Sequence, residues 1–162
     1  MPFNRGLRRD RYQEIAQRET TMTGARPRVF VTRRLPEEIL DRLRAHFEVD
    51  LWDSDLPPDP DSLSEHLSHA KGLFALLTDH ISDALISAAP KLNVISNMAV
   101  GTDNIDLASA TRHGIPVGNT PGVLTETTAD FTFALLLAAA RRVVEGDRFV
   151  REGNWITWGP SV

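Results

Sequence analysis

Residues 72–96 read GLFALLTDHISDALISAAPKLNVIS, and this stretch decides the fold. Segment 72–77 is a continuous apolar run, segment 92–96 (LNVIS) has the pattern of a second strand, and segment 81–89 between them has the character of a helix that stops before Pro90. A continuous apolar run of this length is typical of a parallel strand covered on both faces. The stretch therefore predicts a strand, a helix and a second strand, because parallel neighbours need a helical crossover.

The sequence on either side of this unit repeats the same alternation. Further elements are expected at 29–32 (strand), 36–47 (helix), 49–52 (strand), 63–67 (helix), 105–113 (helix) and 115–117 (strand). Strands that alternate with helices over short connections predict an α/β fold. We expect a flavodoxin-like doubly wound parallel sheet, because helical crossovers cover the faces of such a sheet.

The chain after Pro121 follows a different pattern. Segment 126–144 contains FTFALLLAAA, which is apolar nearly all round and predicts one long helix that is buried on more than one side. The tail at 146–162 carries Trp155 and Trp158 without strand or helix periodicity. We expect the helix to pack against a second domain or a second subunit, because the sheet alone is unable to cover it.

Residues 1–27 differ in composition from the rest of the chain. Residues 1–28 hold seven arginines and three acids, whereas residues 29–162 hold 11 basic and 19 acidic residues. The apolar residues of the first stretch are scattered, so we expect 1–27 to be a disordered extension outside the fold. Met22 lies just before the first predicted strand, and a translation start there is a hypothesis that mass spectrometry of the native amino terminus tests.

Composition excludes several classes of function. The 162-residue chain has no cysteine, which excludes disulfides, thiolate nucleophiles and cysteine-bound zinc and fits a reducing, cytoplasmic location. Its acidic body lacks the basic face that nucleic-acid binding needs. The longest apolar run, 133–140, has 8 residues, against roughly 20 for a helix that spans a bilayer. We therefore expect no nucleic-acid partner and no membrane span.

The segment after the fourth predicted strand has the form of an anion site. It reads NMAVGTDNID at 97–106, with Gly101 in the turn and Asp103 or Asn104 placed to cap the next helix. Gly101 permits either a close backbone approach or a positive φ. The N–H groups of Val100 and Gly101 can form a small nest for a carboxylate. A glycine turn before a capped helix also serves as a plain connection, so the spacing alone leaves both readings open.

Three motifs, in this order, resemble the D-2-hydroxyacid dehydrogenase family. They are AVGTDNID at 99–106, GIPVGNTPG at 114–122 and TETTADFTFALLLAAARR at 125–142. The resemblance extends from residue 28 to about residue 160 and is nearest to the glyoxylate and hydroxypyruvate reductases. It implies two α/β domains, reduction of a small 2-oxo acid with NADH or NADPH, and a homodimer.

The same resemblance implies roles for four residues. It places the substrate carboxylate at the backbone amides of Val100 and Gly101, with Leu77 lining the same cleft. It also places Thr128 beside the nicotinamide end of the cofactor. From the residues alone, Thr128 is an ordinary position in the first turns of a helix without a ligand.

The domain organisation is likewise implied by the resemblance. It makes 28–122 a substrate-binding domain and 123–162 a linking helix and dimerisation arm at the start of a truncated cofactor domain, with the dimer formed through 126–160. A Rossmann cofactor domain holds its dinucleotide with G-x-G-x-x-G, and the sequence contains no G-x-G. The catalytic Arg, Glu and His of the family also lack a counterpart. We therefore expect a truncated reductase that is inactive alone, has no catalytic residue and binds NADPH or NADH weakly.

Other interpretations remain at this point. A non-catalytic flavodoxin-like binding or dimerisation module has the same fold, although the residues after the first strand lack a flavodoxin phosphate loop. Asp79 and His80 follow the third strand and either reach the cleft or serve as a turn residue and a solvated histidine. His66 and His69 need a third ligand to hold a metal. We expect a solvated face there and no metal.

Overall fold

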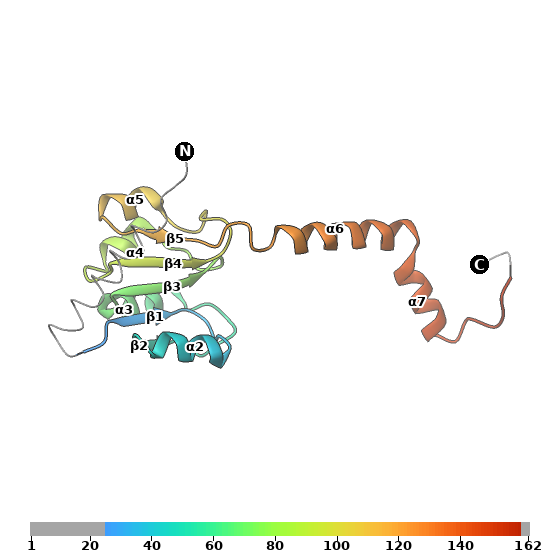
Figure 1. Cartoon of the computed structure of the whole chain (residues 1–162), viewed down its shortest axis with the longest axis horizontal. Helices are drawn as coiled ribbons and strands as arrows, with labels where there is room; N and C mark the ends of the chain where they lie inside the picture. The colour runs from blue at the N-terminus through green and yellow to red at the C-terminus, as the bar shows by residue number, and fades with distance from the viewer. Residues whose placement is uncertain (1–24, 160–162) are drawn as a thin grey trace. The chain divides into compact units, whose positions relative to one another are not determined.

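The computed structural model describes residues 25–159 (Figure 1). The extension predicted at 1–27 lies almost wholly outside these residues, as does Met22. The chain divides into two compact units, Met1–Thr120 and Pro121–Val162, and each is treated by itself.

The first unit is a five-stranded parallel sheet with helices in the connections between strands. Its elements are β1 (Arg28–Val31), α2 (Glu37–Arg44), β2 (Glu48–Leu51), α3 (Pro60–His69), β3 (Gly72–Leu76), α4 (Asp83–Ser87), β4 (Val94–Met98), α5 (Leu107–Arg112) and β5 (Val117–Gly118). The strand order is β2-β1-β3-β4-β5, which is the flavodoxin-like order. The α/β fold and the predicted sheet are confirmed.

Alternating residues of β1 and β3 supply two hydrophobic cores, one on each face of the sheet. Phe30 and Leu73 join the larger core, which includes residues of α3, α4 and α5. Val31 and Phe74, the next residues along the same strands, join a smaller core beneath α2. Successive side chains of a strand point to opposite faces, so a continuous apolar strand fills both cores. The face beneath α2 is covered less completely, and Val94 and Met98 of β4 remain exposed on the sheet.

Capping side chains determine where three of the helices begin. Asp59 accepts hydrogen bonds from the Asp61 and Ser62 amides at the start of α3. Ser82 caps α4 in the same way. The residue that caps α5 is Asp106, whose carboxylate accepts from the Ser109 amide. The prediction that Asp103 or Asn104 caps this helix was wrong, because the helix starts two to three residues later than its apolar pattern suggests.

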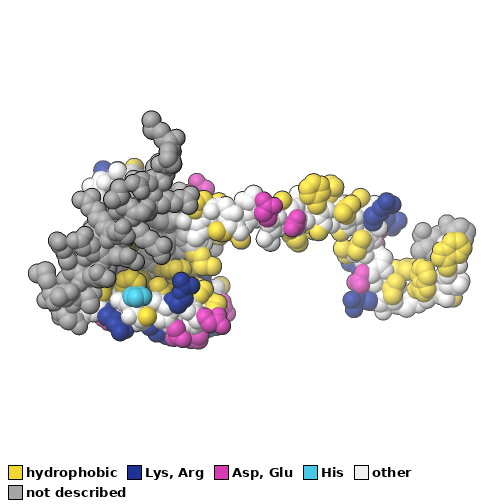
Figure 2. Space-filling model, in the orientation of Figure 1, with side chains coloured by type: hydrophobic (Ala, Val, Ile, Leu, Met, Phe, Trp, Pro, Cys, Tyr) yellow, Lys and Arg dark blue, Asp and Glu magenta, His cyan; other side chains and the backbone are white. Residues whose placement is uncertain are grey.

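The second unit contains two helices, α6 (Thr125–Ala140) and α7 (Val143–Arg151). A single helix over 126–144 was predicted, and this was wrong, because the chain turns at Arg142, which has a left-handed φ of 52°. The tail was also wrongly predicted to lack helix, since Gly146 weakens the apolar pattern of α7. No residue of either helix is buried, and Figure 2 shows hydrophobic side chains exposed along this unit.

Candidate functional site

The turns that follow β3 and β4 lie side by side at the carboxyl edge of the sheet. The two strands pair in parallel with Leu76 opposite Met98, so the turn at Leu77 neighbours the turn that contains Val100 and Gly101. The strand order reverses direction between β1 and β3, and open α/β sheets bind ligands outside the carboxyl ends of strands near such a point. The structure thus brings the three predicted substrate-binding residues to one edge of the sheet.

Two backbone amides in the β4 turn have no acceptor among the described residues. Within residues 25–159, neither the Val100 N–H nor the Gly101 N–H donates a hydrogen bond. The carbonyls of the same residues are held, since Asn119 Nδ2 donates to Val100 O (2.8 Å) and Asn97 Nδ2 donates to Gly101 O (3.0 Å). Leu77 is 65% exposed and Val100 48%. The edge therefore offers unused donors beside apolar side chains, as a site for a small carboxylic acid requires.

Gly101 leaves the amides of this turn accessible because it has no side chain, and not because it adopts an unusual backbone conformation. The left-handed glycines of the described chain are Gly114, Gly122 and Gly153, so the positive φ considered for Gly101 is not observed. A Cβ built at Gly101 has open space around it except for Asp103 Oδ2 at 3.3 Å. The absence of a side chain leaves the amide uncovered. A larger residue at this position would stand beside the free N–H groups.

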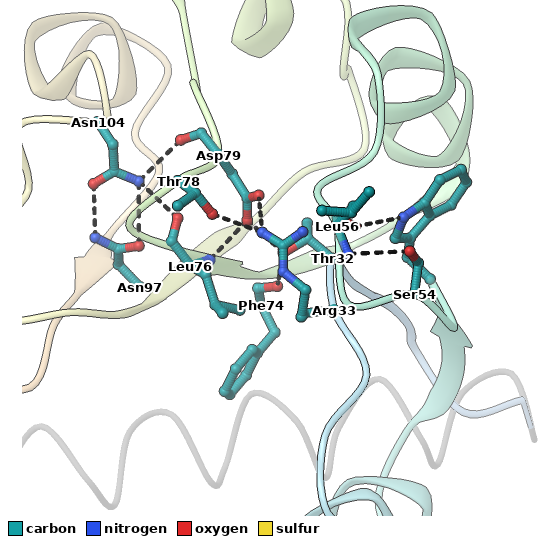
Figure 3. A network of polar contacts seen from close by, with 11 residues as sticks. Thr32, Arg33, Ser54, Leu56, Phe74, Leu76, Thr78, Asp79, Asn97 and Asn104 are labelled. Atoms are coloured by element: carbon teal, nitrogen blue, oxygen red, sulfur yellow. Dashed lines mark hydrogen bonds and ion pairs between the residues drawn. The ribbon is translucent and has the colours of Figure 1, made fainter. Parts of the chain in front are cut away.

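Asp79 anchors the β3 turn from inside the protein (Figure 3). The residue is 2% exposed, and its carboxylate accepts hydrogen bonds from the Leu76 amide (2.7 Å) and from Thr32 Oγ1. Arg33, which is 8% exposed, pairs with it at 3.2 Å and also donates to Thr78 Oγ1 at 2.6 Å. Arg33 Nη1 is buried and has no partner within residues 25–159. Of the two roles considered for Asp79, the structure supports that of a turn residue, whereas His80 is exposed.

Two carboxyl groups of this unit have lowered pKa values, and both are structural. Hydrogen bonds from Ser62, first through its hydroxyl and then through its amide, lower the pKa of Asp59. Hydrogen bonds from the Ser109 hydroxyl and then from the Arg112 guanidinium lower the pKa of Asp83. These bonds connect α4, which contains Asp83, to α5. Neither group belongs to the turns that carry Leu77 or Gly101, so neither is placed to exchange a proton with a ligand there.

His66 has a structural environment rather than the solvated one that was expected. Its ring stacks on Phe30 with centroids 4.4 Å apart, and its Nδ1 lies 2.7 Å from Asp50 Oδ2. Arg28 donates to the same carboxylate oxygen at 2.9 Å. In the part of the chain that the structure describes, no three His, Cys, Asp or Glu side chains gather into a group that could hold a metal. His69 therefore belongs to no such group there.

Thr128 lies on α6 in the second unit and is exposed. Its carbonyl accepts a hydrogen bond from Thr132 Oγ1 inside the helix. A nicotinamide dinucleotide needs a glycine-rich turn between a strand and a helix to approach its pyrophosphate. The strand-to-helix turns described in residues 25–159 hold no such glycine pair, so the residues present do not fit the whole cofactor.

Comparison with known proteins identifies the family of this chain. The family model described as D-isomer specific 2-hydroxyacid dehydrogenase, catalytic domain, matches residues 29–156. The chain belongs to this family. A glyoxylate reductase from Korarchaeum cryptofilum is 56% identical to it over 138 residues, which are 85% of this chain and 42% of that protein. The resemblance drawn from the three sequence motifs is confirmed.

Solved structures of similar proteins agree with this assignment. A crystal structure of a protein from Thermus thermophilus matches with a TM-score of 0.75 at 44% identity, over 83% of this chain and 43% of that chain. An NADPH-dependent glyoxylate/hydroxypyruvate reductase from Sinorhizobium meliloti, solved with NADP and malonate, matches with a TM-score of 0.67 at 29% identity, over 84% of this chain and 43% of that one. The chain spans about two fifths of the length of these relatives.

Several residues that organise the edge were not predicted from the sequence. Thr32 and Arg33 follow β1 and join the Asp79 cluster, and Asn97 supports the β4 turn from inside the larger core. Asn97 was missed because the strand was predicted to end at Ser96, whereas β4 continues to Met98 and includes Asn97. No sequence feature marked Arg33 as buried, because its neighbour Arg34 has the same side chain and is exposed.

Proposed function

We propose that this chain is the substrate-binding part of an NAD(P)-dependent reductase that converts small 2-oxo acids, such as glyoxylate and hydroxypyruvate, into D-2-hydroxy acids. The observation that carries the proposal is the pair of amides at Val100 and Gly101, which donate no hydrogen bond within residues 25–159 and lie beside the exposed Leu77. The family membership and the names of the relatives support it. In this proposal residues 28–122 are the substrate-binding domain and residues 123–162 the linking helix and arm.

The geometry suits a carboxylate with a short chain. Backbone N–H groups that face an anion form charge-assisted hydrogen bonds, which are roughly twice as strong as neutral ones. The carbonyls of Val100 and Gly101 are fixed by Asn119 and Asn97, so the turn does not have to reorganise its own hydrogen bonds when a ligand arrives. Leu77 then limits the size of the group attached to the carboxylate.

The 162 residues are proposed to bind substrate without reducing it. Hydride transfer needs a dinucleotide, which supplies the hydride when bound, and the described residues do not form its site. A nest of amides orients a 2-oxo acid but supplies neither the hydride nor the proton for the product hydroxyl. We expect no oxidation of NADPH or NADH by the purified chain with glyoxylate or hydroxypyruvate. Turnover above that of a heat-treated control would contradict this.

A homodimer through residues 126–160 is part of the same proposal. Phe131, Phe133 and Leu136 of α6 are each more than 60% exposed, and contiguous apolar surface of this kind usually marks an association site. Within residues 25–159 no helix is long and apolar enough to cross a bilayer. Sedimentation equilibrium at micromolar concentration should show a dimer, and a soluble monomer would contradict it.

The absence of cysteine supports a cytoplasmic location.

The exposed α6 also favours a second candidate, a non-catalytic dimerisation module, and one binding experiment separates the two. Oxamate, an unreactive analogue of a 2-oxo acid, is titrated calorimetrically into the whole chain, into Gly101→Val and into Gly118→Val. Gly118 is an exposed glycine whose added Cβ meets only Ile95 O at 4.0 Å, so it controls for the substitution itself. We expect binding to the wild type and to Gly118→Val and none to Gly101→Val. Equal binding by all three would contradict the site at Val100 and Gly101, and no binding by any of them would leave only the dimerisation module.

A further inference from the structure

The side chain of Asn104 joins the two turns that carry the candidate site (Figure 3). Its Nδ2 donates to Leu76 O at 3.1 Å and to Asp79 O at 3.0 Å, which are the carbonyls on either side of the β3 turn. Its Oδ1 accepts from Asn97 Nδ2 at 2.9 Å. One side chain from the β4 turn is therefore bonded to both ends of the β3 turn.

Asn97 extends the connection to the amide pair. Its Nδ2 carries two hydrogens, and these reach Asn104 Oδ1 and Gly101 O. Asn97 is 1% exposed, so its amide has no water to replace a lost partner. Gly101 O belongs to the peptide that joins Gly101 to Thr102, directly after the Gly101 amide. Because Asn97 holds this oxygen and Asn104 holds Asn97, the position of Gly101 depends on Asn104.

The orientation of the Asn104 amide is determined by its partners. Turning the group by 180° would place Oδ1 against two carbonyl oxygens and Nδ2 against the donor of Asn97, which would break three hydrogen bonds at once. The backbone adds a fourth connection, since the Ile81 amide donates to Asn104 O at 2.8 Å. Asn104 is also released from the usual role of an asparagine before a helix, because Asp106 caps α5.

We propose that Asn104 is a positioning residue, which sets the spacing between Leu77 and the amides of Val100 and Gly101 without touching the ligand. This inference rests on the proposed function for its consequence in binding. The physical link is independent of any ligand. Removing the Asn104 amide takes a donor from the carbonyls of Leu76 and Asp79, so that Leu76 O keeps only the Asp79 amide. It also leaves Asn97 Nδ2 with Gly101 O as its one acceptor. Both turns then lose their common support, so they should loosen together.

The test measures motion and binding in the same samples of the whole chain. Backbone ¹⁵N relaxation is recorded for the wild type, Asn104→Ala, Asn104→Asp and the control Asp59→Ala, which removes the cap of α3 and leaves both turns untouched. In both Asn104 variants we expect order parameters near residues 76–79 and 100–103 to fall from about 0.85 to below about 0.6. The control should keep both turns rigid. Asn104→Asp preserves the volume of the side chain, so it remains informative if Asn104→Ala fails to fold.

Oxamate titration then separates this inference from the proposed function. We expect both Asn104 variants to bind oxamate at least tenfold more weakly than Asp59→Ala. If the wild type does not bind oxamate but both turns loosen in the variants, the proposed function fails and the positioning role stands. If the turns stay rigid, or only one of them loosens, or affinity is unchanged in a wild type that binds, the positioning role is overturned.

Discussion

The tetrapeptide Phe-Ala-Leu-Leu occurs twice in this chain, at 74–77 and at 133–136, and adopts two structures. The first copy begins inside β3 and runs into the turn, with Ala75 wholly buried between two neighbouring strands. The second copy lies in the middle of α6, where Phe133 is 67% exposed. The four side chains are the same in both, so the difference comes from what surrounds them.

The flanking sequence and the available partners decide between the two structures. The first copy is bounded by Gly72 and by the Thr78–Asp79 turn, so only a short element fits, and β1 and β4 supply hydrogen bonds on both sides. The second copy is closely followed by three alanines, which favour helix, and no strand in the described part of its own unit pairs with it. The sheet unit therefore contains its own partners, whereas α6 and α7 carry apolar surface that the described residues of their unit leave exposed.

The largest expected effect compares one substitution in the two regions. Leu73→Ala removes a buried side chain of β3 and should lower the free energy of unfolding of the sheet unit by about 4 kcal/mol. Leu135→Ala on α6 should change it by less than about 0.5 kcal/mol, because Leu135 is exposed. Urea unfolding followed by tryptophan fluorescence and circular dichroism measures both. Similar losses for the two variants would mean that α6 is part of the core of the sheet unit.

Charge pairs provide the second contrast. Asp79→Asn leaves the Arg33 guanidinium buried beside a neutral group and should destabilise the sheet unit by about 3 kcal/mol. Asp147→Asn in α7 breaks a solvent-exposed pair with Arg151 and should cost at most about 0.5 kcal/mol. Thermal unfolding of both variants in the same buffer checks the prediction. A small effect at Asp79 would show that its pair with Arg33 is solvated.

Acid should weaken the sheet unit through Asp59 and Asp83. The folded state lowers the pKa of both groups, so their contribution to stability is present above the pKa of the unfolded chain, about 4, and is lost as pH falls through the folded pKa. Melting temperatures between pH 6 and pH 3 should therefore fall at the acid end. Ser109→Ala removes the main donor to Asp83 and should flatten that fall. An unchanged pH profile in this variant would contradict the assignment.

The smallest expected effect concerns the charge beside the amide pair. Asp103 lies next to Gly101, and its carboxylate opposes the binding of an anion there. Asp103→Asn should strengthen oxamate binding about two- to threefold, roughly 0.5 kcal/mol for an exposed charge, and the gain should shrink at high salt. Calorimetry at low and at high salt, about 20 mM and about 500 mM, provides the comparison. Weaker binding by the variant would indicate that Asp103 contacts the ligand directly.

The sheet was predictable because its strands are short apolar runs bounded by residues that interrupt helices and strands. Gly72, Pro90 and Gly114 separate elements clearly, and every predicted strand and helix of the first unit appears within a few residues of its expected place. The arm was less predictable. Arg142 ends α6 by adopting a left-handed conformation that glycine normally supplies, and nothing in an Arg-Arg pair signals that turn.

At the candidate site, backbone features were easier to predict than side-chain partners. The turn after β4 followed from Gly101 and from its place after a strand, but the role of Asn104 did not, because an asparagine before a helix usually indicates a cap. The Arg33–Asp79 pair joins residues 46 apart in the sequence, and only the parallel pairing of β1 with β3 brings them together. Contacts of that kind depend on the strand order, which no local pattern contains.

The measurement that tests the account most directly is a ¹H–¹⁵N titration of the whole chain with oxamate. The amides of Val100 and Gly101 donate no hydrogen bond within residues 25–159, so a carboxylate bound there must shift their resonances strongly. The account predicts saturable shifts at these two amides and at Leu77, and their loss in Gly101→Val. Shifts confined to residues 121–159, or none at saturating oxamate, would contradict the claim that the carboxyl edge of the sheet binds the substrate carboxylate.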